Sequence, residues 1–276
     1  MDDSDISVRV DLMSIFNAAH FSLHHYAKGY YPTSHSSLTS LPNNRFFFPL
    51  ANPNGQANFV EYSAGRYTLT PGKMYFVPAF LPVKFRLDHK LYFLSIHTRL
   101  EIFPGVDFFS GCQRILEMPT PPEFEKLMAI FDSDDSDCSY QNAFLAGSLA
   151  FSILARMTNY YNLEDFWAPM ALRKYVNLVD YLKQNANAST SVSELSEMGK
   201  TSRENFTRHF TADTKMTPKQ LIDRFVTMRC ISLIEQGYSF KETAHRLRFR
   251  DEFAFSRYFK RNMGVSPRDW RKNSNL

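Results

Sequence analysis

The sequence predicts an α+β protein with a β-rich N-terminal part and an all-α C-terminal domain. Short runs of aromatic and β-branched residues, separated by turn residues, continue to about residue 98. Helix start signals follow one another from about residue 170. The net charge also changes sign, from −5 over residues 1–170 to +9 over residues 171–276. We therefore expect two domains, 1–165 and 170–276, with a linker between residues 162 and 169.

Composition excludes several classes of protein. The 276 residues are 44% apolar, yet no apolar run reaches the length of a membrane-spanning helix. The chain starts with the acidic segment 1–5 rather than with a signal peptide, so a cytoplasmic location is expected. Cys112, Cys138 and Cys230 are too far apart for a zinc-finger spacing and are odd in number. We expect three ordinary thiols.

The N-terminal strands are predicted from alternating aromatic and β-branched residues bounded by turns. Strands at this spacing are typical of a barrel or sandwich. Residues 11–26 have no clear period and receive no assignment. The predicted strands lie near residues 45–48, 58–62, 73–78, 84–87 and 91–98.

Two helices are predicted after the strands, over residues 123–131 and 140–160. The second has apolar residues on more than one stripe of its surface. It therefore has to bury two faces, either in the core of its own domain or against a second subunit.

The helices of the C-terminal domain have clear start signals. Residues 191–194 and 239–242 have the Ser-x-x-Glu form of a capping box. Thr217-Pro218 and Ser266-Pro267 each combine a capping hydroxyl with proline at the first helical position. Gly237 ends the helix that Pro218 begins.

An internal repeat gives the functional prediction. The segment 206–210, Phe-Thr-Arg-His-Phe, recurs 49 residues later as 255–259, Phe-Ser-Arg-Tyr-Phe. Each copy lies in the second helix of a predicted helix-turn-helix, a motif whose second helix enters the DNA major groove. The helix pairs are 192–199 with 203–212 and 240–247 with 252–262, joined by a helix over 218–236.

The two phenylalanines of each copy are four residues apart, so they lie on one helix face and are predicted to pack inward. Thr207 and Arg208, like Ser256 and Arg257, are then free to face a groove. Arginine can bind guanine O6 and N7 with two hydrogen bonds. A solvated face or a phosphate contact is the alternative for each arginine.

The stretch 171–276 resembles the DNA-binding domain of the AraC/XylS family of bacterial transcription regulators. The resemblance covers about 100 residues and is strongest over residues 248–271, which read RFRDEFAFSRYFKRNMGVSPRDWR. Arg248, Thr243 and the pair Phe253-Ala254 depart from the family pattern, which has glycine at the first of these positions. The resemblance implies base reading by Glu204, Thr207, Arg208, Glu252, Phe253, Ser256 and Arg257, and phosphate contacts by Lys200, Arg203, Arg250, Lys260 and Arg261.

Residues 67–79 resemble the cupin-like β-barrel of effector-sensing members of this family. This resemblance implies a small-molecule effector, with a sugar as one candidate, and dimerisation through the helices that follow the barrel. Double-stranded DNA, a second copy of the chain and RNA polymerase are the expected candidate partners. Arg45, Tyr62, Arg86 and His97 are the candidate effector-binding residues.

Two alternatives remain open. The β domain could serve only for dimerisation or protein docking, or the chain could be a cupin enzyme fused to a DNA-binding domain. The enzyme needs a metal centre, but His24 and His25 are adjacent and would point to opposite faces of a strand. His89 and His97 stand alone. We expect no metal, no cofactor and no catalytic residue, and the sequence predicts a sequence-specific DNA-binding transcription regulator.

Overall fold

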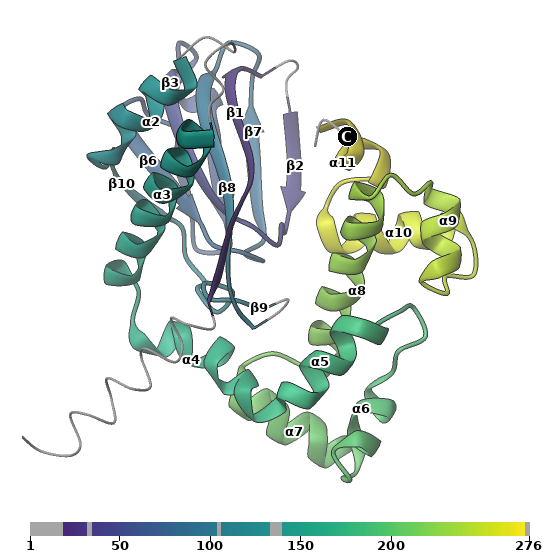
Figure 1. The fold of residues 1–276 in the computed structure, drawn as a ribbon. Helices are drawn as coiled ribbons and strands as arrows, with labels where there is room; N and C mark the ends of the chain where they lie inside the picture. The colour runs from purple at the N-terminus through teal and green to yellow at the C-terminus, as the bar shows by residue number, and fades with distance from the viewer. Residues whose placement is uncertain (1–18, 32–34, 104–105, 133–139, 274–276) are drawn as a thin grey trace, which may run out of the picture.

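The computed structural model describes residues 19–31, 35–103, 106–132 and 140–273. Figure 1 shows a β-rich region, with two helices on one side, beside a region made of helices alone. The α+β prediction is therefore confirmed. Cys112 and Cys230 are buried free thiols, whereas Cys138 lies outside the described residues. No helix in the described part is long and apolar enough to cross a membrane.

The β region consists of two antiparallel sheets rather than a continuous closed barrel within the described ranges. The larger sheet has the order β1-β8-β3-β6-β10, and β9 also pairs with β8. The smaller sheet has the order β2-β7-β4-β5. The strand bounds are β1 His20–Tyr30, β2 His35–Thr39, β3 Asn44–Ala51, β4 Phe59–Tyr62, β5 Gly65–Thr68, β6 Lys73–Val77, β7 Val83–Leu87, β8 Tyr92–Phe103, β9 Val106–Asp107 and β10 Leu116–Pro119. A short 3₁₀ turn, η1 (Gly55–Ala57), precedes β4.

Alternation along β3 separates two apolar cores. Phe46 and Phe48 belong to the core that includes helix α3. Phe47, between them, packs in the core shared by the two sheets. Arg45 has the same parity as Phe47, so its side chain also points between the sheets.

Helices α2 (Glu123–Asp132) and α3 (Tyr140–Met157) cover the outer face of the larger sheet, as Figure 1 shows. The α3 face with Ala146, Ala150 and Ile153 is buried there. Another α3 face leaves Tyr140 and Phe144 exposed. The helix prediction for 140–160 is confirmed for residues 140–157, and a 3₁₀ turn, η3 (Thr158–Tyr160), follows.

The C-terminal helices follow the predicted plan closely. The segment expected to be a linker contains a helix, α4 (Leu163–Ala171), which contacts α7. Both capping boxes form, at Ser191 and Ser239, because each serine accepts from the backbone N–H three residues on. The bounds are η4 Leu172–Tyr175, α5 Val176–Asn185, α6 Val192–Met198, α7 Arg203–Thr214, α8 Pro218–Glu235, α9 Phe240–Arg246, α10 Glu252–Met263 and α11 Pro267–Asn273.

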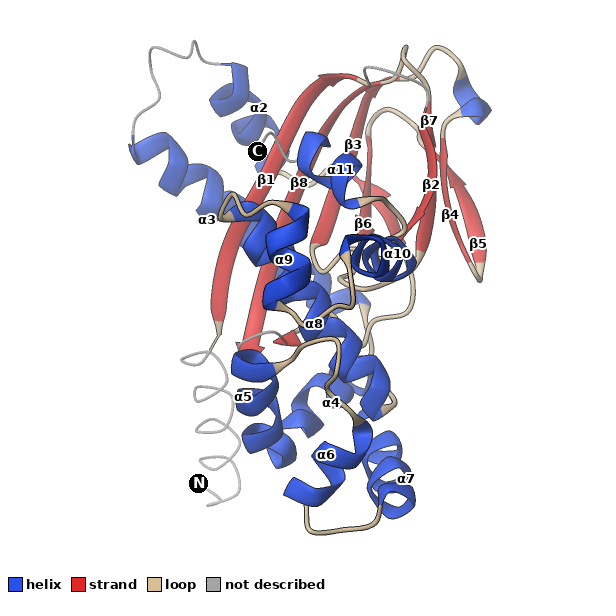
Figure 2. Ribbon diagram, turned by 90° about the vertical axis from the view of Figure 1, so that its right-hand side faces the viewer, coloured by secondary structure: helices blue, strands red, loops and turns tan. Residues whose placement is uncertain are grey.

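The two regions share a contact surface. Leu41, Ile102 and Val106 of the β region are buried in the same apolar cluster as the core of the helical region. On α8, the Arg224 guanidinium lies over the Phe80 ring, 4.3 Å from its centroid. Figure 2 shows α8 and α10 in front of the sheets.

Candidate nucleic-acid interface and effector site

The two helix-turn-helix modules form at opposite ends of α8, as Figure 1 shows. The first module is α6 with α7, and the second is α9 with α10. Helix α8 has 18 residues and is about 27 Å long at about 1.5 Å per residue. This length approaches the roughly 34 Å between successive major grooves on one side of B-DNA.

Equivalent residues fix the position of α7 and α10 within their modules. The Ser202 side chain caps α7 and the Asp251 side chain caps α10, each by accepting the backbone N–H three residues later. Two buried phenylalanines anchor each helix to the core, at 206 and 210 in α7 and at 255 and 259 in α10. The caps and anchors determine which side chains remain outward.

The residues predicted to read bases lie outside the cores of α7 and α10. Thr207 and Ser256, between the anchors, are half-buried. Arg208 is exposed and donates to the Asn205 side chain at 3.0 Å. Phe253 is 78% exposed, which is unusual for a large apolar side chain. The remaining three, Glu204, Glu252 and Arg257, are exposed.

The residues predicted to contact phosphates are all exposed. Lys200 has φ 50° and Arg248 has φ 56°. The turn of each module therefore contains one residue with a left-handed backbone conformation. Arg248, which replaces the glycine of the family pattern, adopts the left-handed turn rather than avoiding it. Arg250 is paired with Asp251 at 3.0 Å. The other exposed cations are Arg203, Lys260 and Arg261.

In the β region, the structure brings together two of the four predicted effector residues. Arg45 on β3 and His97 on β8 are direct register partners. His25 on β1 is in turn the partner of His97, and their ring centroids are 5.2 Å apart. Because partners in register share a face of the sheet, these three side chains form a row across it.

The other two predicted effector residues lie elsewhere. Arg86 is exposed and has the opposite parity to the buried Phe85 on β7. Tyr62 ends β4 and stacks on Tyr67 with ring centroids 6.3 Å apart. The structure therefore does not join Arg86 to the row that contains Arg45 and His97.

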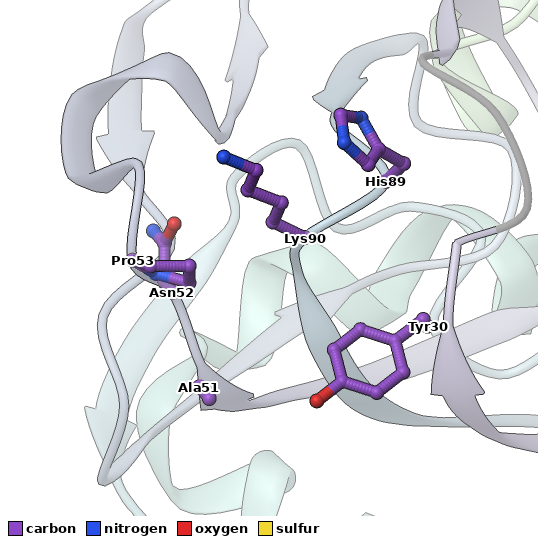
Figure 3. A pocket seen from close by; sticks show the side chains of 6 residues that line it. All are labelled: Tyr30, Ala51, Asn52, Pro53, His89 and Lys90. Carbon is purple, nitrogen blue, oxygen red and sulfur yellow. The ribbon is translucent and has the colours of Figure 1, made fainter.

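Sequence reasoning missed a surface pocket at one end of the sheets. Tyr30 ends β1, and Asn52 and Pro53 follow Ala51 at the end of β3. The turn between β7 and β8 supplies His89 and Lys90. Figure 3 shows Lys90 extending across the space between Asn52 and His89. None of the four predicted effector residues lines this pocket, whose lining is Tyr30, Ala51, Asn52, Pro53, His89 and Lys90. Only spatial proximity joins these turns, so no sequence motif marks them.

No group of three His, Cys, Asp or Glu side chains within the described ranges could hold a metal ion. His24 and His25 lie on β1, where a bulge interrupts the pairing between Leu23 and His25. Burial lowers the pKa of His25, which favours its neutral form at neutral pH.

Comparison with known proteins agrees with this architecture. Residues 195–273 match the family model described as a helix-turn-helix domain. The matched residues lie within the stretch 171–276 that resembles the AraC/XylS DNA-binding domain, which supports that resemblance. No curated protein matches the chain.

The whole chain is similar in fold to ToxT from Vibrio cholerae. An apo ToxT variant from strain SCE256 has a TM-score of 0.61 and 11% identity over 91% of this chain and 97% of that chain. Wild-type ToxT with a bound unsaturated fatty acid has a TM-score of 0.57 and 12% identity, covering 92% and 94%. ToxT from strain O395, bound to (E)-4-(8-methylnaphthalen-1-yl)but-3-enoic acid, has a TM-score of 0.55 and 11% identity, covering 93% and 99%.

Proposed function

We propose that this chain regulates transcription by reading two DNA half-sites with α7 and α10 while its β domain, within residues 1–165, binds a small-molecule effector. The observation that carries the DNA-reading part is the repeated geometry of the modules. In both, an exposed arginine follows a half-buried hydroxyl residue between two buried phenylalanines. Because α8 joins the modules as one helix, the two reading helices can address successive grooves of the same duplex.

The two half-sites should differ in sequence because the outward residues differ. The first module offers Glu204 and Arg208, and the second offers Phe253 and Arg257. An exposed phenylalanine suits contact with a thymine methyl group, whereas a glutamate can accept from cytosine N4. We therefore expect an asymmetric operator, which selection of bound DNA from a random pool would reveal.

Arg208→Ala and Arg257→Ala are each expected to weaken specific binding by about 1–3 kcal/mol and to relax preference at a few adjacent bases. The reason is loss of a two-bond contact to a guanine. Fluorescence anisotropy on the selected operator and on single-base variants measures both effects. Arg66→Ala, which changes an exposed arginine on β5, is the control. Equal weakening on every sequence would instead make the arginines phosphate contacts.

Effector binding in the β domain is supported by its fold and by its interior. Two of the ToxT structures with a similar fold contain carboxylic acids. Within this chain, Arg45 and His97 supply polar groups to an otherwise apolar core between the sheets. A ligand regulates only if it binds one arrangement of the DNA-binding domain better than another. Operator affinity measured with and without candidate metabolites tests this part.

A homodimer is also part of the proposal. Tyr140 and Phe144 are 88% and 78% exposed and are four residues apart on α3, so they share one helix face. Large aromatic side chains exposed together are typical of protein interaction surfaces. The helix thus has an uncovered apolar face in addition to the one packed on the larger sheet. The oligomeric state in solution decides whether a second copy covers it.

A further inference from the structure

Among the residues that the structure describes, Arg45 is a buried cation without an anionic partner. It is only 4% exposed, and its Nη1 donates to Thr39 Oγ1 at 3.1 Å. Its Nε and Nη2 groups are buried and have no hydrogen-bond partner within the described ranges. Native proteins rarely leave such donors unsatisfied, because each buried donor without an acceptor costs free energy. A guanidinium in this state is complementary to a carboxylate, which accepts two parallel hydrogen bonds.

No described carboxylate acts as a counter-ion for Arg45. Burial lowers the pKa of Arg45 to about 9, so the side chain still carries its charge at neutral pH. His97 faces it across the strand pair. Burial, and after it the Arg45 charge, hold the pKa of His97 well below its ordinary value, so the imidazole is neutral. Neutral His97 can offer one further N–H donor to an anion.

A cluster of aromatic side chains begins next to the guanidinium. Its Cζ atom lies 5.4 Å from the centroid of the Phe85 ring. Phe85 contacts Phe47, which stacks on Phe93 with centroids 4.9 Å apart. This environment favours a ligand with an apolar body and excludes a strongly hydrated ion, because desolvating such an ion is costly. The chemistry of the lining therefore differs from that of a neutral-sugar site, in which several hydroxyls need partners.

We propose that Arg45 is the anchor for the carboxylate of an effector with an apolar body, bound between the two sheets. This inference rests on the proposed effector function and names the class of ligand. Arg45 belongs to the larger sheet and Thr39 to β2 of the smaller one, so the site spans both. Thr39 also contacts the DNA-binding domain, because its Cα lies 3.0 Å from the position of a Cβ added to Gly264. A ligand on Arg45 thus lies next to the domain contact.

The test uses thermal unfolding of the full chain with hexanoate and benzoate, compared with hexanamide and benzamide. The carboxylates are expected to raise the Tm of the wild type by about 3 °C at saturating concentration, and the amides to leave it unchanged. Arg45→Met keeps the length of the side chain but removes the charge. It should abolish the shift while unfolding at the same or a higher temperature without ligand, because a buried unpaired charge is removed.

Arg66→Met is the matched control, since it makes the same change at an exposed position on β5. It should keep the full carboxylate response. The proposal is overturned if no carboxylate shifts the wild type, if Arg45→Met keeps the shift, or if Arg45→Met unfolds at a much lower temperature, as a structural role requires. Operator binding by the same preparations separates the two levels. If one of these results is found but the protein still binds its operator, only the carboxylate site at Arg45 is contradicted. If the wild type does not bind DNA, the proposed regulatory function itself is contradicted.

Discussion

Asp107 is a buried carboxylate that joins three segments of the β domain. Its Oδ2 accepts from the Asn44 side chain and from the Leu100 backbone N–H, and its Oδ1 accepts from the Phe109 N–H, each at 2.8 Å. Asp107→Ala leaves these three donors without acceptors, so we expect it to lower the free energy of unfolding by about 3 kcal/mol. Urea denaturation measures the loss. Asp180→Ala, an exposed control on α5, should change it by less than about 0.5 kcal/mol.

The shifted pKa of Asp107 also makes the free energy of unfolding depend on pH. Burial outweighs the three hydrogen bonds and raises the pKa of Asp107 to about 6. Because this value is above that of the unfolded chain, the native state binds the proton more tightly. The contribution from Asp107 is therefore present at low pH and lost as the pH rises through about 6. The stability difference between wild type and Asp107→Ala should be about 1 kcal/mol larger at pH 5 than at pH 7. A difference independent of pH would contradict the raised pKa.

Residue type alone identified part of the candidate effector site. Arg45 and His97 stood out as polar residues in apolar strands, and strand register brings them together. Thr39, which holds Arg45 from the other sheet, had no sequence signal, because the contact depends on how two sheets pack. Asp107 was missed because its hydrogen bond to Asn44 joins residues 63 positions apart in the sequence, which come together only when β3 and β8 pair.

At the scale of elements, the turn inside each helix-turn-helix stores backbone strain. Lys200 and Arg248 both adopt positive φ, a conformation that costs a residue with a Cβ roughly 1–2 kcal/mol. Arg248→Gly relieves this strain, and we expect it to raise the free energy of unfolding by about 1 kcal/mol, less than the full strain because glycine is also freer in the unfolded chain. Thermal denaturation of the full chain measures the gain.

Lys200→Gly provides the comparison in the first module. A gain of similar size there would show that the strain belongs to the turn itself rather than to the arginine. If Arg248→Gly instead lowers the stability, the aliphatic part of the side chain must contribute packing that exceeds the strain. Both substitutions also remove an exposed positive charge, so operator affinity should be measured separately.

The helical elements were predictable from sequence and part of the β domain was not. Capping residues, the Pro218 start and the Gly237 end are local signals, and the structure has α8 over 218–235 against the predicted 218–236. In contrast, β1 was not assigned. Its burial varies between exposed and intermediate, and it is held by antiparallel pairing with β8, more than 60 residues away in sequence. An edge strand without a fully buried face gives no clean alternation.

At the scale of the whole molecule, the β domain contacts both α8 and the segment after α10. Arg224 on α8 covers the Phe80 ring, and Gly264, which ends α10, lies against Leu38 and Thr39 of β2. The second module follows α8 directly in the chain. The Arg224–Phe80 contact on α8 and the Gly264 contact after α10 therefore fix the position of this module against the β domain. Loss of the Gly264 contact should therefore free the DNA-binding domain without unfolding it.

Gly264→Ala is expected to separate the two domains. An added Cβ would overlap the Leu38 carbonyl oxygen and lie 2.6 Å from the carbonyl carbon, so β2 has to move away. Small-angle scattering should show a larger radius of gyration than in the wild type, and operator affinity should lose its response to effector. Gly264 also has φ 79°, so the substitution adds backbone strain of about 1 kcal/mol.

Gly237→Ala separates strain from contact. Gly237 has a similar φ of 87°, but an added Cβ would have no atom within 4 Å. Both variants should therefore lose about 1 kcal/mol of stability from the strained backbone. Only Gly264→Ala should increase the radius of gyration in solution. If the two variants have the same scattering profile, the β2 contact does not hold the domains together, and the Arg224–Phe80 contact and the shared apolar cluster suffice.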